Sequence, residues 1–292
     1  MTECRHCGVV SPVPYPSAEE IASYYTSAIT PNDWEEIHYV RLDLNPKAIA
    51  GTEHLADQFT RLLGYPGRLL EVGCCSGWVL KAARDRDWTV RGIELAPKFS
   101  RFARDTLNLD VFEGAVTGIM PDSWPRYDLI VAFDVFEHLQ DPVSDLRMLR
   151  EVAADGAYLL VTTPNISSLV ARFWGLNWRQ VLPSHINYST PASMAAVLAR
   201  SGWTLERISE PRYWDPDPRR EKSGRLVEIG KFVARLVLNV LVVRPSARFP
   251  ALKSLPARLS RGKLSWDQFM YRVGDQPVLG DVMLVVARLM PT

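Results

Sequence analysis

The stretch that decides the fold is "LLEVGCCSGW", residues 69–78, in which an apolar strand enters a loop with glycines at 73 and 77. Glycine lets a backbone turn tightly and approach a ligand closely. An acid, Glu71, precedes the first glycine by two residues, and a helical pattern begins after the second. A strand–loop–helix turn of this kind places backbone N–H groups beside an anionic ligand group. The stretch therefore predicts a ligand-binding turn at the carboxyl edge of a sheet.

Strand and helix patterns alternate along the chain on both sides of this turn. The predicted strands are continuous apolar runs at 68–73, 89–95, 110–114, 127–135, 156–165, 203–210 and 282–288. The helices expected between them cover 77–87, 97–108, 142–153 and 190–202, after earlier helices at 17–28 and 45–64. Apolar strands that alternate with helices indicate an α/β protein with a doubly wound, mostly parallel seven-stranded sheet.

The chain divides into three predicted parts. Residues 1–50 form an N-terminal segment with lid helices, residues 51–212 with 278–292 form the core, and 213–277 form a basic helical insertion before the last strand. Hydrophobic residues make up 47% and charged residues 23%, as in an ordinary soluble protein. No apolar run resembles a signal peptide or reaches the roughly 20 residues of a membrane span. We expect a cytoplasmic protein.

Positive charge is concentrated in one segment, although the net charge of the whole chain is +1. Residues 219–263 hold twelve basic and two acidic residues, and apolar residues recur at helical spacing over 226–243. A basic amphipathic helix suits an anionic membrane surface, which would place the protein at the inner membrane face. A cap over a phosphorylated or lipid-like acceptor, a dimer interface and simple packing on the core stay open, as does the oligomeric state. No nucleic-acid recognition module accompanies the charge, so nucleic acid is not expected.

An acid at the end of the second strand narrows the ligand. Glu94 follows Gly77 by 17 residues, and a carboxylate at this place can accept hydrogen bonds from both hydroxyls of a ribose. Residues 73–79 do not fit the G-x-G-x-x-G pattern with which nicotinamide dinucleotides are bound. A nucleoside ligand other than a dinucleotide is favoured.

The turn resembles motif I of the class I S-adenosylmethionine (SAM) methyltransferases, E/D-x-G-x-G-x-G. Glu71, Gly73 and Gly77 match it, and Cys75 stands at the middle glycine. Further stretches resemble small-molecule members of that group: "FDVFEHLQDP" (133–142), "TTPN" (162–165) and the residues from 177 to 203. Residues 4–25 resemble the region between the second knuckle of a zinc ribbon and the core in related members. The resemblance covers about 4–212 and 278–290, and it implies a Rossmann-like fold, SAM as cofactor and methyl transfer as activity.

The cofactor site that the resemblance implies consists of Glu71, Gly73, Cys74, Cys75, Gly77, Glu94, Leu95, Ala115 and Phe133. Acids at position 71 in the family orient the loop or the methionine amino group, and an ion pair is the alternative here. A Cβ at Cys75 crowds the cofactor, and a positive φ there would cost about 1 kcal/mol. The acid that many members place after the third strand is missing near Ala115, so adenine recognition would rely on backbone groups.

Two histidines are candidates for catalysis, because methyl transfer needs a base when the acceptor must lose a proton. His138 lies just beyond the fourth strand and His185 beyond the fifth. A backbone hydrogen bond is the alternative role of His138. Trp174, Trp178 and Tyr188 either wall an acceptor pocket or pack under a lid.

Cys4 and Cys7 have the spacing of a zinc knuckle, but a structural zinc needs four ligands, so no metal site is expected. The four cysteines do not form the framework of a secreted disulfide protein. We therefore interpret the chain as a SAM-dependent methyltransferase for a small-molecule or lipid-linked acceptor, with oxygen as the expected accepting atom and nitrogen or carbon left open. A member that has lost catalysis and serves as a binding or membrane-associated partner is the alternative. A nicotinamide oxidoreductase ranks third.

Overall fold

The computed structural model describes residues 1–17, 19–21, 23, 45–119, 121–209, 272–273, 276–277 and 281–290. The predicted basic helix at 226–243 and most of the predicted helix at 17–28 lie outside these residues. Within the described part of the chain, no helix is both long and apolar enough to cross a membrane.

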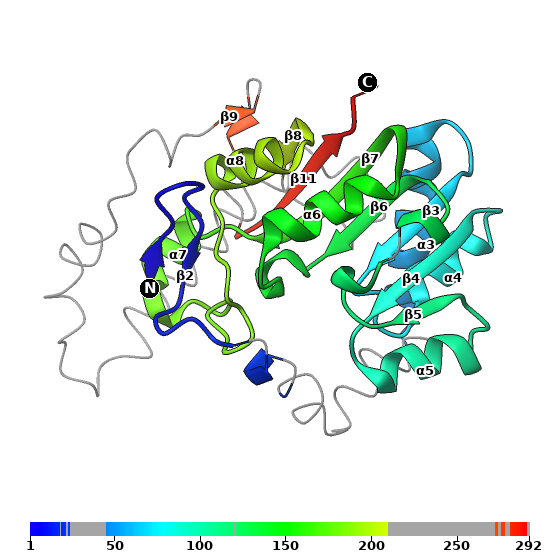
Figure 1. Cartoon of the computed structure of the whole chain (residues 1–292), viewed down its shortest axis with the longest axis horizontal. Coiled ribbons are helices and arrows are strands. Elements are labelled where there is room, and N and C mark those ends of the chain that lie inside the picture. Colours follow the sequence, from blue (N-terminus) through cyan, green and yellow to red (C-terminus); the bar gives the residue numbers. More distant parts are fainter. Residues whose placement is uncertain are drawn as a thin grey trace, which may run out of the picture. The chain divides into compact units, whose positions relative to one another are not determined.

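Seven strands form one sheet in the order β5-β4-β3-β6-β7-β11-β8 (Figure 1). Their bounds are Arg68–Val72 for β3, Thr89–Glu94 for β4, Val111–Glu113 for β5, Tyr127–Phe133 for β6, Ala153–Pro164 for β7, Thr204–Ser209 for β8 and Val282–Arg288 for β11. The strands from β5 to β7 in this order are parallel to one another, and β11 runs antiparallel to both of its neighbours, β7 and β8. The predicted fold class is confirmed. The strand order reverses between β3 and β6, which is where sheets of this kind bind ligands.

The helices begin and end at the signals that the sequence carries. They are α3 Pro46–Leu63, α4 Trp78–Arg84, α5 Pro97–Asp105, α6 Pro142–Glu151, α7 Leu169–Trp174 and α8 Pro191–Ser201. Gly64 ends α3 with a left-handed φ of 86°, and Thr190 begins α8 with a capping box. Two details differ from expectation: α6 stops at Glu151 because β7 already begins at Ala153, and the short helix α7 was not predicted.

Both faces of the sheet are buried, as a parallel sheet requires. In β6, Leu129 and Val131 pack into a cluster with residues of α3, α4 and α5. Ile130 and Ala132 point the other way and join a cluster that includes residues of α6 and α8. Figure 1 shows α6 and α8 in front of the strands. Polar side chains are therefore concentrated at the ends of the strands, where the loops meet.

A small N-terminal hairpin is attached to one of these loops. β1 (Thr2–Glu3) pairs with β2 (Val10–Ser11), and Val10 exchanges two backbone hydrogen bonds of 2.9 and 2.8 Å with Tyr188. A second two-stranded ladder joins β9 (Arg272–Val273) to β10 (Gln276–Pro277) within the predicted insertion.

We predict that Leu129→Ala lowers the free energy of unfolding by about 2–5 kcal/mol, because it opens a cavity between fully buried neighbours. Leu176→Ala is the matched control, since that leucine is 76% exposed and its truncation should change little. Urea unfolding followed by circular dichroism measures both variants. Equal effects would contradict the assignment of the core.

Candidate functional site

The loop after β3 has the tight geometry that its glycines predict. Gly73 and Gly77 have φ values of 66° and 81°, in the left-handed region that favours glycine. A Cβ at Gly73 would lie 2.5 Å from Cγ2 of Val135, and a Cβ at Gly77 would lie 2.5 Å from Cδ1 of Leu109. At both positions a Cβ would force a neighbouring side chain to move, in addition to the backbone strain, so glycine is strongly favoured at both.

Cys75 also has a left-handed conformation, with φ of 46°, as its place at the middle glycine of the motif suggests. A side chain in this region costs about 1–2 kcal/mol. The Cys75 backbone N–H donates to Oε2 of Glu94 at 2.8 Å, and the Ala96 N–H donates to Oε1 at 2.7 Å. Each oxygen keeps a second lone pair. The Glu94 carboxylate therefore holds the loop in place and can still accept ribose hydroxyls.

The two adjacent thiols differ in their surroundings. Cys74 packs into the core beside Leu80, so only its backbone faces the loop. Cys75 is half-buried at the loop itself. Burial and nearby carboxylates raise the pKa of both thiols well above the usual range, so both stay protonated. Cys75 therefore behaves as a small neutral group.

Glu71 has a buried carboxyl group that is only partly hydrogen-bonded. Its side chain is buried, and among the described residues its Oε2 has no hydrogen-bond partner. Burial, followed by the charge of Glu94, raises the pKa of Glu71 well above its usual range, and the backbone N–H of Leu80 opposes this only in part. A buried carboxylate oxygen without a donor is costly. The atom is thus suited to accept a hydrogen bond from a cationic ligand group.

The remaining predicted cofactor residues lie at the same edge of the sheet. Leu95 follows β4, Ala115 follows β5, and Phe133 ends β6 and stacks on Phe59 with ring centroids 6.3 Å apart. Val116, beside Ala115, is buried in the core and offers no polar side chain. The structure therefore brings all nine predicted residues to one edge, with no side-chain acid after β5.

His138 and His185 meet, although they are 47 residues apart in the sequence. Their rings form a T-shaped pair with centroids 4.8 Å apart. Nδ1 of His138 lies 2.8 Å from the Ser184 carbonyl oxygen, and Nδ1 of His185 lies 2.8 Å from that of Gln180. A carbonyl can only accept, so each Nδ1 donates and each Nε2 carries the lone pair. The backbone bond expected as the alternative for His138 is present and fixes its tautomer.

Burial keeps both imidazoles neutral. It is the main cause that lowers the pKa of His138 to about 4 and also lowers the pKa of His185. Glu137 lies beside them, and its pKa is raised to about 8 by burial and by the charge of Asp134. The Thr163 hydroxyl donates to Glu137 Oε2 at 3.0 Å. Glu137 and Thr163 both lie in stretches that resemble the family, but the sequence predicts no role for either.

Backbone hydrogen bonds join the two segments that carry the histidines. The N–H groups of Ile186 and Asn187 both donate to the Glu137 carbonyl, at 2.8 and 3.0 Å. The Asn187 side chain donates to the Leu139 carbonyl. The turn after β6 and the loop before α8 therefore form one unit.

Trp178 and Tyr188 are buried against Ala171, with ring centroids 6.3 Å apart, so they pack beneath this unit. Trp174 is half-buried in the same cluster. For Trp178 and Tyr188, packing is therefore the role that the structure supports.

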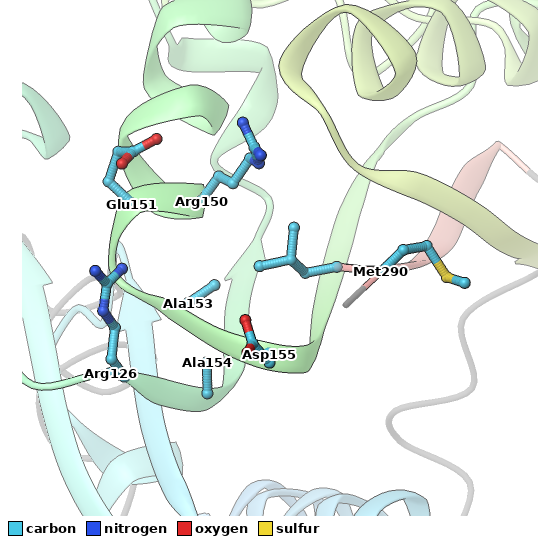
Figure 2. A pocket seen from close by; sticks show the side chains of 8 residues that line it. Arg126, Arg150, Glu151, Ala153, Ala154, Asp155 and Met290 are labelled. Atoms are coloured by element: carbon cyan, nitrogen blue, oxygen red, sulfur yellow. The ribbon is translucent and has the colours of Figure 1, made fainter. Parts of the chain in front are cut away.

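A separate hollow lies at the opposite edge of the sheet (Figure 2). It is lined by residues around the start of β6, the end of α6, the start of β7 and the end of β11, namely Arg126, Arg150, Glu151, Ala153, Ala154, Asp155, Leu289 and Met290. Since β11 is antiparallel, its end meets the beginnings of the other strands. This hollow is remote from the loop after β3 and contributes nothing to the predicted site.

Comparison with known proteins shows to which family the core is similar. A family model described as a methyltransferase domain matches residues 47–208. A ubiquinone biosynthesis O-methyltransferase from Xylella fastidiosa (strain 9a5c) is 26% identical over 158 residues, which span 50% of this chain and 64% of that protein. One from Xanthomonas euvesicatoria is 25% identical over 182 residues, 58% of this chain and 76% of the relative.

Among solved structures, a methyltransferase from Haloferax volcanii in complex with the Trm112 activator is similar with a TM-score of 0.51. The two chains are 12% identical, and the match covers 93% of this chain and 98% of the other. At this identity the likeness shows the fold alone.

The left-handed loop leads to a prediction about the adjacent cysteines. Cys75→Gly relieves a strained backbone, so its free energy of unfolding should stay within about 1 kcal/mol of the native value or rise. Cys74→Gly removes a buried side chain and should cost about 2 kcal/mol. Chemical unfolding of the two variants tests the assignment. Greater destabilisation by Cys75→Gly than by Cys74→Gly would contradict it.

Proposed function

The chain belongs to the methyltransferase domain family, that of the class I SAM-dependent methyltransferases, and on that premise we propose that it transfers the methyl group of SAM to an oxygen of a small-molecule acceptor. The observation that carries the proposal is the pair of buried carboxylates, Glu71 and Glu94, beside the left-handed loop after β3. The name of the relatives supports oxygen as the accepting atom. A lipid-linked acceptor and contact with an anionic membrane through 219–263 belong to the same proposal.

The residues present fit the cofactor. Glu94, which already accepts two backbone N–H groups, has lone pairs left for the ribose hydroxyls. The unpartnered Oε2 of Glu71 suits the ammonium group of the methionine part. Gly73 and Gly77 let the backbone come close to the ligand. Leu95, Ala115 and Phe133 would flank the adenine, which is recognised through backbone groups.

SAM supplies an electrophilic methyl group when it is bound. The task of the chain is to hold an acceptor oxygen in line with that group in a site from which water is excluded. His138 and His185 carry neutral imidazoles with lone pairs on Nε2, and these can take the proton that a hydroxyl acceptor loses. The rigid unit formed by the two histidine-bearing segments supports such positioning.

The alternative, a member that has lost catalysis, rests on Cys75 and on the missing acid after β5. The loop keeps its left-handed conformation at this residue, and the Cys75 N–H still binds Glu94. These two features favour a working cofactor site.

Calorimetric titration with S-adenosylhomocysteine, SAM and NAD tests the cofactor. We expect binding of the first two, and affinity that rises with pH. The pKa of Glu71 is raised in the free protein, whereas an ammonium group binds the carboxylate form. Below that pKa the ligand must displace a proton from Glu71, which weakens binding. The affinity therefore rises with pH and levels off above that pKa.

Glu71→Gln should weaken binding about 10- to 100-fold, the value of a hydrogen bond to a charged group, and should remove most of the pH dependence. Glu53→Gln, an exposed substitution on α3, is the control. If neither SAM nor its demethylated product binds at millimolar concentration, the proposed function fails.

The histidines are tested with a panel of phenols and tritiated SAM. His185→Ala should lower turnover by about 10²- to 10⁴-fold, the usual contribution of an acid–base group, while the affinity for S-adenosylhomocysteine stays the same. His54→Ala, on α3, is the matched control. Unchanged turnover in His185→Ala would remove this residue from the mechanism.

A further inference from the structure

Three side chains that can bind a metal converge where the turn after β6 meets the loop before α8. Glu137, His138 and His185 each offer one ligand atom, and these atoms lie within 4.8 Å of one another. Glu137 is 1% exposed and His185 is 7% exposed. His138 is half-buried, so three groups that can bind a metal are gathered where little water reaches them, and a shared ion is one way to satisfy them together.

The hydrogen bonds of the two histidines are those of metal ligands. Metal-binding histidines usually donate their second ring N–H to a carbonyl or carboxylate, which fixes the tautomer and directs the other nitrogen to the ion. Here Nδ1 of His138 donates to Ser184 and Nδ1 of His185 donates to Gln180, each at 2.8 Å. The lone pair of each ring is therefore on Nε2, the atom that would bind an ion.

A hydrogen bond also orients the carboxylate of Glu137. Thr163 donates to Oε2 of Glu137 at 3.0 Å from β7. None of the ion pairs among the described residues includes Glu137. A cation bound between Glu137 and the histidines would pair with the carboxylate, for which these ion pairs supply no partner.

We propose that Glu137, His138 and His185 bind a divalent transition-metal ion such as Zn²⁺. Two imidazole nitrogens and one carboxylate oxygen form the ligand set of many catalytic zinc sites, in which a fourth position stays open for water or substrate. Mg²⁺ and Ca²⁺ prefer oxygen ligands throughout, so the two nitrogens disfavour them. The sequence alone led us to expect no metal site.

The role of the ion rests on the proposed function, whereas binding of the ion does not. Val135, two residues before Glu137, lies against Gly73 of the cofactor loop, so the turn that carries Glu137 and His138 lies beside that loop. An acceptor oxygen bound there would lose its proton more readily, because a bound cation stabilises the oxyanion. In that case the histidines act as ligands, and the released proton goes to solvent.

The test uses full-length protein in which Cys4→Ser and Cys7→Ser remove the other soft metal ligands near the N-terminus. After treatment with a chelator, the protein is titrated with Zn²⁺ and with Co²⁺, whose visible absorption reports nitrogen ligands and coordination geometry. We expect one equivalent of either ion. Glu137→Gln and His185→Ala should each weaken binding more than about tenfold, since even outer residues of metal sites contribute 10- to 100-fold.

Two further variants keep the test independent of folding. Thr163→Val preserves side-chain shape and removes only the hydrogen bond to Glu137, so it should weaken Co²⁺ binding about 10- to 100-fold. His54→Ala should leave binding unchanged. Binding of less than a tenth of an equivalent, or equal binding in His185→Ala and His54→Ala, would overturn the proposal, as would displacement of Co²⁺ by millimolar Mg²⁺.

S-adenosylhomocysteine titration on the same samples separates the two proposals. If Co²⁺ binds while S-adenosylhomocysteine does not, the metal site stands and the proposed function fails. If S-adenosylhomocysteine binds while neither metal ion does, the reverse holds.

Discussion

The carboxylate of Glu94 connects the parts of the site. It accepts the N–H of Cys75 with one oxygen and that of Ala96 with the other, so it joins the loop after β3 to the turn after β4. These bonds satisfy donors that would otherwise be orphaned at the buried edge of the sheet. They also hold Cys75 in a conformation that its own side chain disfavours. The backbone that faces the ligand thus depends on an acid 19 residues further along the chain.

The fold was predictable because its determinants are local. Alternating apolar strands and helices, a glycine at the end of α3 and a threonine at the start of α8 are visible in the sequence. The motif likewise placed Glu71 and Cys75 at the carboxyl edge, and the end of the second predicted strand placed Glu94 there. The short helix α7 was missed, because six residues carry too little periodicity to be distinguished.

The arrangement around Glu137 was not predictable from the residues, for a physical reason. Nδ1 of His138 donates to the Ser184 carbonyl and Nδ1 of His185 to that of Gln180, and no sequence pattern reports which carbonyl an imidazole will reach. The role of Thr163 depends on the parallel register of β6 and β7, which places the end of β7 beside the turn after β6. Such contacts follow from the packed fold rather than from spacing along the chain.

The electrostatics of the loop explain why a cysteine is compatible with its proposed role. Glu94, Glu71 and Asp134 all raise the pKa of the Cys75 thiol, in addition to burial. Three carboxyl groups therefore act on one small side chain at the carboxyl edge of the sheet. Such a field favours cationic ligands, and SAM carries positive charge on both its sulfonium and its ammonium group. A neutral thiol leaves that field intact, whereas a lysine or arginine would cancel part of it. What Cys75 changes at the middle glycine is thus the space beside the ligand, and the charge that would attract the ligand is preserved.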